Sequence, residues 1–311
     1  MAKNFINRTY IEGYIYDHNL EKKISGPNSK NPGTEFIMGT INVATDDAGV
    51  NVVPVHYTYV TATTSTGKPS ASYNTLLGVI NGEYKTAIAD GKENAAKVRI
   101  DSAIALNEFY TDRNGETTLV SAKRNEGGFI HVEPFFAKTN EDDRNTFEAD
   151  MLITNVRRVE ANEEQNQPEK VIVKGCIFDF RKTLLPVEFT AIDPNAMDYF
   201  EGLEASEKNP TFTKVWGSQV STTIVREIVE ESAFGNNKVR TVSSTRKDFV
   251  LTGANREPYA WDDESTLTAA EVSEAIAARE TYLATLKQRQ EEYKVSKSAP
   301  APVPKNASFT F

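Results

Sequence analysis

The stretch Ile11-Glu12-Gly13-Tyr14-Ile15-Tyr16-Asp17-His18 decides the expected fold, because a weaker copy returns as Val173-Lys174-Gly175-Cys176-Ile177-Phe178-Asp179-Phe180. A fainter echo, residues 100–107, lies between the two copies. Their spacing of about 75 to 90 residues is a domain-scale period rather than a solenoid repeat. Each copy alternates like a β-strand, and a glycine inside a strand marks a bulge or bend that lets a small barrel close. We therefore expect repeated small β-barrels.

The composition indicates a soluble globular protein. The chain has 311 residues, of which 39% are hydrophobic and 25% charged, enough for two or three small domains. It holds no apolar run long enough for a membrane span, and residues 1–5 lack the apolar core of a secretion signal. A cytoplasmic protein without membrane contact is expected. The single cysteine, Cys176, and three histidines show no metal-ligand spacing, so we expect neither a metal nor a cofactor.

The formal net charge of −9 argues against a uniformly basic surface. The excess of acidic residues is shared by both halves of the chain. Any site for a polyanion must therefore be a local groove rather than a global positive field.

The first expected unit, residues 1–95, follows the order of an OB-fold, a five-stranded Greek-key barrel. Its expected elements are a strand at 5–16, a long Gly/Pro-rich loop at 25–33, strands at 35–45 and 50–61 around a turn at 46–49, and a helix at 72–88. Long loops of this kind often carry function.

The remaining chain is expected to form a second barrel-like β unit at 96–168 and a third OB-like unit at 169–264. The polar stretch 162–169 is either a boundary between units or the tip of a long hairpin. Thr268 and Glu271 form a capping box that announces a C-terminal helix, assigned to 265–294. Residues 295–311 are rich in proline and are expected to be disordered. The expected class is mainly β, with tandem OB-like Greek-key barrels, short helices and a C-terminal helix.

Aromatic strand residues next to basic dipeptides recur in all three units. Such barrels bind single strands by stacking bases on exposed aromatics beside a basic groove, each stacked base contributing roughly 1 to 3 kcal/mol. The candidate nucleic-acid-binding residues are Tyr14, Tyr16, His18, Lys22, Lys23, Tyr57, Tyr59, Tyr110, Lys123, Arg124, Phe129, Phe178, Phe180, Arg181, Lys182 and Trp216. The alternative interpretation is that about half of these aromatics form the core, as is common in β-proteins.

Catalytic interpretations are weaker. The chain contains no Walker-type phosphate loop, and its histidines stand outside any recognisable catalytic triad. The acidic clusters 141–143 and 262–264 lie in polar connections, where solvated loops or helix N-termini explain them. We expect no catalytic residues and no enzymatic activity.

In architecture the chain resembles the OB-fold single-stranded DNA-binding proteins of the bacteriophage replication and recombination type. The residues that carry this resemblance are Gly13 and Gly175 within strands, the hairpins at 46–49 and 113–115, and the terminal segment 309–311. The resemblance implies a host-cytoplasmic DNA-binding protein acting in DNA replication, recombination or repair, with single-stranded DNA as partner and a possible homo-oligomeric state. It also implies that Phe309 and Phe311 bind a replication or recombination protein.

One departure from that family concerns the last 17 residues, which contain Lys297 and Lys305 and no acidic residue. Proteins of the resembling kind usually end in an acidic tip that finishes in Pro-Phe, so recognition by a partner that reads acidic tips is in doubt. The alternative function is a structural or assembly scaffold without nucleic-acid binding. A scaffold would bury Tyr14, Tyr16, Phe178 and Phe180, whereas strand binding requires them exposed.

Overall fold

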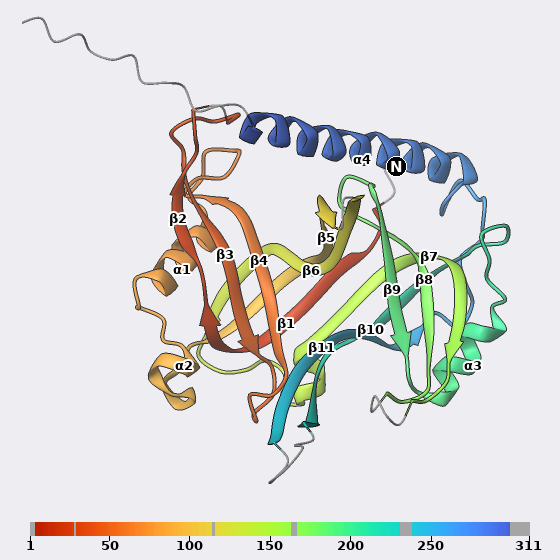
Figure 1. Ribbon diagram of the computed structural model, residues 1–311, viewed down its shortest axis with the longest axis horizontal. Coiled ribbons are helices and arrows are strands. Elements are labelled where there is room, and N and C mark those ends of the chain that lie inside the picture. The colour runs from red at the N-terminus through yellow and green to blue at the C-terminus, as the bar shows by residue number, and fades with distance from the viewer. Residues whose placement is uncertain (1–3, 28, 114–115, 163–166, 231–237, 299–311) are drawn as a thin grey trace, which may run out of the picture.

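The computed structural model describes residues 4–27, 29–113, 116–162, 167–230 and 238–298. Within these ranges eleven strands form one hydrogen-bonded sheet, accompanied by short helices and one long C-terminal helix (Figure 1). The expected mainly β class is confirmed. Among the described residues, no helix combines the length and the hydropathy needed to cross a membrane.

The first barrel is closed by five strands. They are β1 (Asn7–His18), β3 (Glu35–Ala44), β4 (Val52–Thr61), β5 (Lys97–Arg113) and β6 (Glu116–Glu133). Antiparallel pairs join β1 to β3 and β5, β3 to β4, and β5 to β6, and a short parallel contact of β4 with β6 closes the ring. This is the OB pattern. The edge strand β2 (Glu21–Ile24) extends β3, and helix α1 (Ala71–Ile80) lies between β4 and β5 in the chain.

The second barrel repeats this pattern element by element. Its elements are β7 (Asn145–Val159), β8 (Lys170–Phe178), β9 (Leu184–Ala191), α3 (Pro194–Gly202), β10 (Thr211–Glu230) and β11 (Lys238–Ala254). Antiparallel pairs join β7 to β8 and β10, β8 to β9, and β10 to β11, and a parallel contact of β9 with β11 closes the ring. The chain therefore contains tandem OB-like barrels, as expected.

The pairing groups the strands differently from the three expected units. The divide at 95/96 falls inside the first ring, because β5 and β6 complete it. The divide at 168/169 falls between β7 and β8, which pair antiparallel across the polar stretch 162–169. The described residues on either side of that stretch belong to one antiparallel strand pair.

The glycines that suggested a repeat lie near bulges, in non-equivalent strands: Gly13 precedes the register shift between Ile15 and Asp17, and Gly175 lies opposite the shift between Ile153 and Asn155 of β7. Gly13 belongs to the first strand of its barrel, whereas Gly175 belongs to β8, the second strand of the other. A Cβ atom would lie 2.0 Å from the Ala44 carbonyl oxygen at Gly13 and 2.1 Å from that of Leu152 at Gly175. Register shifts occur close to both sites. The backbones approach there more closely than any side chain allows.

Helix boundaries depart from the expectation at two places. The expected helix at 72–88 ends at Ile80 and resumes as the short α2 (Ala87–Asp90), followed by the 3-10 turn η1 (Lys92–Asn94). Helix α4 (Ala269–Ser298) begins at the expected capping box, since Thr268 Oγ1 accepts from the Glu271 amide at 3.2 Å. It continues through 295–298, part of the expected tail.

The two barrels are joined through their first strands. Strands β1 and β7 pair antiparallel from Asn7↔Ala149 to Ile11↔Asn145. Because equivalent strands meet antiparallel, an approximate two-fold rotation relates the barrels. Each has its own core, one centred on Ile41 and Val55 and the other on Val173 and Phe189.

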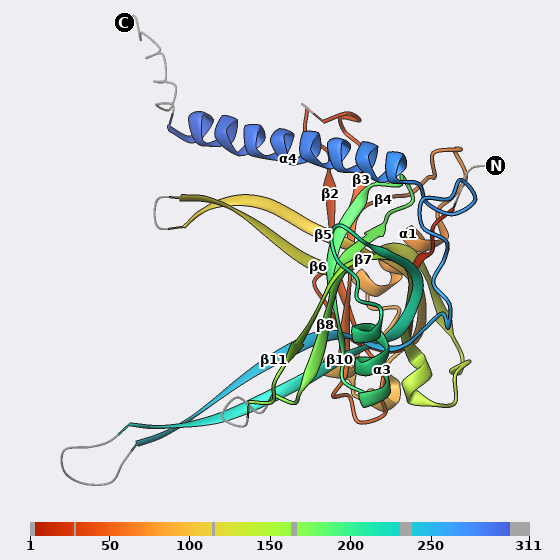
Figure 2. The ribbon, with the colours of Figure 1, turned by 90° about the vertical axis from the view of Figure 1, so that its right-hand side faces the viewer.

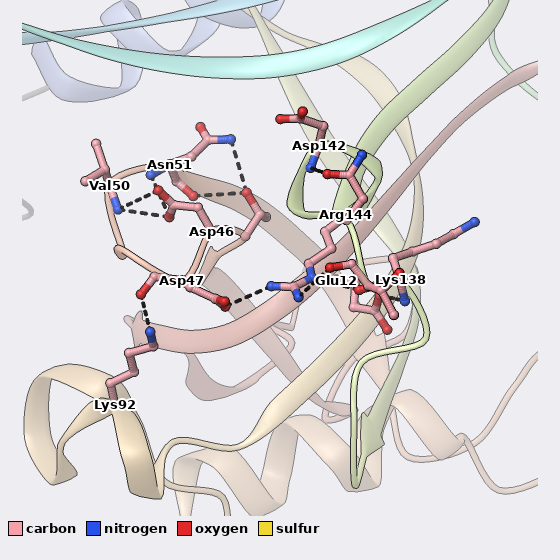
Figure 3. Close-up of polar contacts among 12 residues, drawn as sticks. Glu12, Asp46, Asp47, Val50, Asn51, Lys92, Lys138, Asp142 and Arg144 are labelled. Atoms are coloured by element: carbon pink, nitrogen blue, oxygen red, sulfur yellow. Dashed lines mark hydrogen bonds and ion pairs between the residues drawn. The ribbon is translucent and has the colours of Figure 1, made fainter.

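The connection between the barrels, residues 134–144, is anchored by buried charges (Figure 3). Fully buried Glu12 accepts hydrogen bonds from the amides of Ala137 and Lys138 at 2.6 and 2.9 Å. Buried Arg144, in the 3-10 turn η2 (Glu141–Arg144), donates to the Lys138 carbonyl and to the Asp47 carboxylate, both at 3.0 Å. If the connection moved away, the buried groups Glu12 and Arg144 would lose these hydrogen-bond partners, so the connection is held in one conformation.

Candidate nucleic-acid interface

Two long hairpins leave the barrels on the same side of the molecule (Figure 2). We define the first arm as residues 106–113 and 116–123 of β5 and β6. The second arm is residues 219–230 and 238–248 of β10 and β11. Both arms are the hairpin between the fourth and fifth strands of an OB-like barrel. In OB-folds this connection and the face of the second and third strands bind oligonucleotides.

The base of the second arm packs against the first barrel. Gln219 and Asn125 exchange two side-chain hydrogen bonds at 2.8 and 3.0 Å, and both residues are buried. The Ser221 amide donates to Asn51 Oδ1 at 2.9 Å. These amides are satisfied across the junction of the barrels, which locks the orientation of the arm.

The base of the first arm packs against the second barrel in the same manner. Lys123 Nζ donates to the Glu188 carbonyl oxygen and lies 5.4 and 5.2 Å from the ring centroids of Phe189 and Phe249. Burial lowers the pKa of Lys123 to about 8. Each barrel therefore receives the arm of the other.

A first groove lies on the face of the second and third strands of the first barrel. It has a volume of about 440 Å³ and is bounded by β2, β3, β4 and the base of the first arm. Lys23, His56 and Arg124 line it, together with Glu21. His56 Nδ1 lies 2.9 Å from Thr40 Oγ1, and Arg124 pairs with Glu126 at 2.6 Å. The groove presents positive charge within a polar, mixed surface.

Lys247, at the base of the second arm, adds a further positive charge beside this groove. Burial lowers the pKa of His56, and the nearby charges of Arg124 and Lys247 lower it further. Burial also lowers the pKa of Lys247, whereas the carboxylate of Asp17 acts in the opposite direction. His56 is consequently neutral at physiological pH, and the cations beside it are Arg124 and Lys247.

A second groove, of about 330 Å³, lies on the equivalent face of the second barrel. Arg157, Lys174 and Glu188 line it. Lys123 from the first arm binds the backbone carbonyl of Glu188, but its amine is buried over Phe189 and Phe249 and does not line this groove. Arg157 and Lys174 are absent from the residues selected by sequence. The sequence signal used for the other candidates, an aromatic-containing strand beside a basic dipeptide, also occurs at Arg157-Arg158 and could have identified Arg157.

Of the sequence-selected residues, the structure brings Lys23 and Arg124 together in the first groove, whereas Lys123 is buried against Phe189 and Phe249 of the second barrel. Tyr14 and Tyr16 are half-buried on the outward side of β1, where Tyr14 meets the edge of Phe136 at 4.9 Å. His18 Nδ1 accepts from the Leu20 amide at 3.2 Å.

Lys22 pairs with Glu35 at 3.0 Å rather than lining the groove. Tyr110 is half-buried on the first arm. Tyr59 is exposed and contacts Phe36, with ring centroids 4.5 Å apart.

Two selected aromatics belong to the core, and their assignment to base stacking is wrong. Tyr57 and Phe178 are each 2% exposed. Tyr57 continues the inward alternation of Val53 and Val55. Phe178 stacks on Phe5, with ring centroids 4.2 Å apart. Neither ring has a face available to a base.

The other selected aromatics lie on different surfaces. Phe180 is 89% exposed in the turn between β8 and β9, next to Lys182, with the Arg181 guanidinium 5.0 Å from its ring centroid. The turn borders a hollow of about 700 Å³ between the first arm and α4. Trp216 lines a hollow of about 800 Å³ on the outer face of the joined sheet. Phe129, 69% exposed, pairs with Asp101, another residue of that outer hollow.

Phe309 and Phe311, the expected partner-binding residues, lie outside the described residues. Within the described ranges, no group of three or more His, Cys, Asp or Glu side chains is arranged to hold a metal ion.

Comparison with known proteins identifies the family. The family model described as YorF matches residues 6–289 of the chain. The chain belongs to the YorF family. A comparison of this YorF-family chain with curated protein sequences gives no match.

Among solved structures, the chain is similar to the single-stranded DNA binding protein from Thermus aquaticus. The wild-type structure is 9% identical, with a TM-score of 0.46 over 83% of this chain and 96% of that chain. A deletion mutant of the same protein is 9% identical, with a TM-score of 0.45 over 84% and 98%. Since these TM-scores lie below 0.5, the assignment of OB-like barrels for the YorF-family chain rests on its own strand pairing.

Proposed function

We propose that this YorF-family chain binds single-stranded DNA, without enzymatic activity, in DNA replication, recombination or repair. The observation that carries the proposal is the crossed arrangement of the arms. Each barrel presents a groove on the strand face that OB-folds use, and the arm of the other barrel packs beside that groove. Lys247 lies near His56 of the first groove, and Lys123 binds the backbone of Glu188, a residue of the second groove.

The chemistry of the grooves suits an extended single strand. Lysine and arginine in the grooves neutralise phosphates along the backbone, and the exposed rings of Tyr59 and Phe180, which lie outside the grooves, offer faces for bases. Acidic residues such as Glu21 and Glu188 share the grooves, so only a few phosphates are neutralised. We therefore propose binding with little sequence preference and a moderate salt dependence.

Fluorescence anisotropy with a labelled strand of about 30 nucleotides, compared with the matching duplex at two salt concentrations, tests the proposal. We expect binding to the single strand that weakens as salt rises, and much weaker binding to the duplex. Absence of single-strand binding at low salt would overturn the proposal.

Paired substitutions then locate the site. Lys23→Ala with Arg124→Ala addresses the first groove, and Arg157→Ala with Lys174→Ala the second. Each pair removes two phosphate contacts, so the slope of log K against log salt should flatten by about 1.4 for a single strand. The control, Lys68→Ala with Lys287→Ala, removes two exposed charges outside both grooves and should leave the slope unchanged.

The alternative, a structural or assembly scaffold, is favoured by one observation. Phe129 and Trp216 border the outer face of the joined sheet and are exposed, as a protein-interaction surface would require. If strand binding is absent, variants Phe129→Ala and Trp216→Ala tested for the oligomeric state of the chain by light scattering would examine this role. A change in mass would support it.

A further inference from the structure

Helix α4 begins in the second barrel. Val272 and Ala275 pack against a small apolar cluster that contains Phe178, Leu184 and Leu267. The capping box at Thr268 satisfies the first turn, so the helix has a fixed origin.

The middle of α4 is tied to the first arm by a buried ion pair. Arg279 donates to both carboxylate oxygens of Glu108 at 2.6 and 3.3 Å, and to the Leu184 carbonyl at 3.2 Å. The side chain of Glu108 is 2% exposed and that of Arg279 is 14% exposed. A bidentate pair at this depth holds one geometry, and removing one partner strands an uncompensated charge.

The end of α4 is tied to the same arm nearer its tip. Lys294 Nζ donates to the Asp112 carboxylate at 2.7 Å and to Thr117 Oγ1 at 3.2 Å. Asp112 and Lys294 are partly exposed, so this pair contributes less than the buried one. Figure 2 shows α4 running along the first arm, while the second arm projects away from it.

We infer that α4 is a brace that fixes the first arm relative to the second barrel and thereby positions the arm for nucleic-acid binding. At the base of this arm, Arg124 lines the first groove, and Lys123 packs against the second barrel beside Glu188 of the second groove. A change in the direction of the arm would therefore displace a cation of the first groove and disturb the wall of the second. Arg279 and Lys294 act as positioning residues, through the arm. The role in binding rests on the proposed function, whereas the mechanical role does not.

Hydrogen exchange of the arm amides measures the brace without nucleic acid. In Arg279→Ala, we expect amides in 106–112 and 117–123 to exchange about tenfold faster or more, because the arm opens locally. The amides of β3 and β8, in the barrel walls, should keep their rates. Lys294→Ala breaks only the exposed ion pair with Asp112 and should speed amide exchange near the tip of the arm by about threefold. This variant still tests the brace if Arg279→Ala does not fold. Lys287→Ala removes an exposed charge from the same helix and serves as control.

The same variants are then titrated with the labelled single strand. Faster arm exchange together with about tenfold weaker binding in Arg279→Ala supports the inference. Arm exchange equal to that of the wild type in both variants overturns the brace, and faster exchange with unchanged affinity overturns its role in binding. If the wild type binds no single strand but the arm amides still exchange faster in the variants, the proposed function fails and the mechanical brace stands.

Discussion

Lys123 packs at the junction of the two barrels, and the burial of its charged amine there lowers the stability of the folded state. Its amine lies among the rings of Phe189 and Phe249, where burial lowers its pKa from 10.5 to about 8. Below pH 8 the amine is charged in both the folded and unfolded states, and the folded state carries the cost of burying it. Between pH 8 and 10.5 the folded state binds fewer protons, so the free energy of unfolding rises with pH in this window.

Lys123→Met should therefore be more stable than the wild type at pH 7, by about 2 kcal/mol. The pKa shift corresponds to about 3 kcal/mol, and loss of the cation–π contact offsets about 1 kcal/mol. Urea unfolding at pH 7 and pH 10 measures the difference between variant and wild type, which should shrink as pH rises. Lys287→Met, on the exposed side of α4, should show no such trend. A stability difference independent of pH would contradict this account of Lys123.

Among the elements, strand β8 depends on a glycine opposite the bulge of β7. Gly175 lies so close to the backbone of Leu152 and Ile153 that a methyl group has no room. Neighbouring backbone cannot move aside as the end of a flexible side chain can, so the strand or its partner must shift.

Gly175→Ala should lower the free energy of unfolding by about 3 kcal/mol, the upper range for overpacking. Gly26→Ala is a matched control, because a methyl group added there meets nothing within 4 Å and the stability should change by less than about 0.5 kcal/mol. Chemical denaturation of both variants tests the difference. Equal stability of the two alanine variants would show that β7 and β8 adapt without cost.

At the scale of the whole molecule, the barrels are interlocked rather than merely adjacent. Strands β1 and β7 share a ladder, and the buried amides of Asn125 and Gln219 satisfy one another across the junction. Breaking this junction leaves polar groups on both sides without their hydrogen-bond partners. The two barrels should therefore unfold in one transition.

Gln219→Ala should cost about 2 kcal/mol and reduce this cooperativity, since Asn125 loses a buried partner. Trp216 and Trp261 both lie in the second half of the chain, so tryptophan fluorescence reports on that half while circular dichroism reports on all strands. The two unfolding curves should coincide in the wild type and separate in the variant. Gln290→Ala, on α4, is the control. Coincident curves at an unchanged midpoint in Gln219→Ala would refute the interlock.

The amino-acid sequence by itself determined the local elements of this protein. Alternating strands and the cap at Thr268 were predicted correctly, because each depends on neighbours within a few residues. It also indicated that Lys23 and Arg124 lie where a groove could use them.

Only the tertiary structure decided which strands close each ring and which aromatics face inward. Tyr57 and Tyr59 lie two positions apart on the same strand, yet one is core and the other exposed, because the register of β4 shifts between Tyr57 and Val60 and Val60 packs against the core instead. The contacts β4 with β6 and Lys123 with Glu188 join residues about 65 to 70 positions apart, beyond any local period. Such pairings follow from packing of the whole chain, since burial is shared among strands that local sequence does not relate.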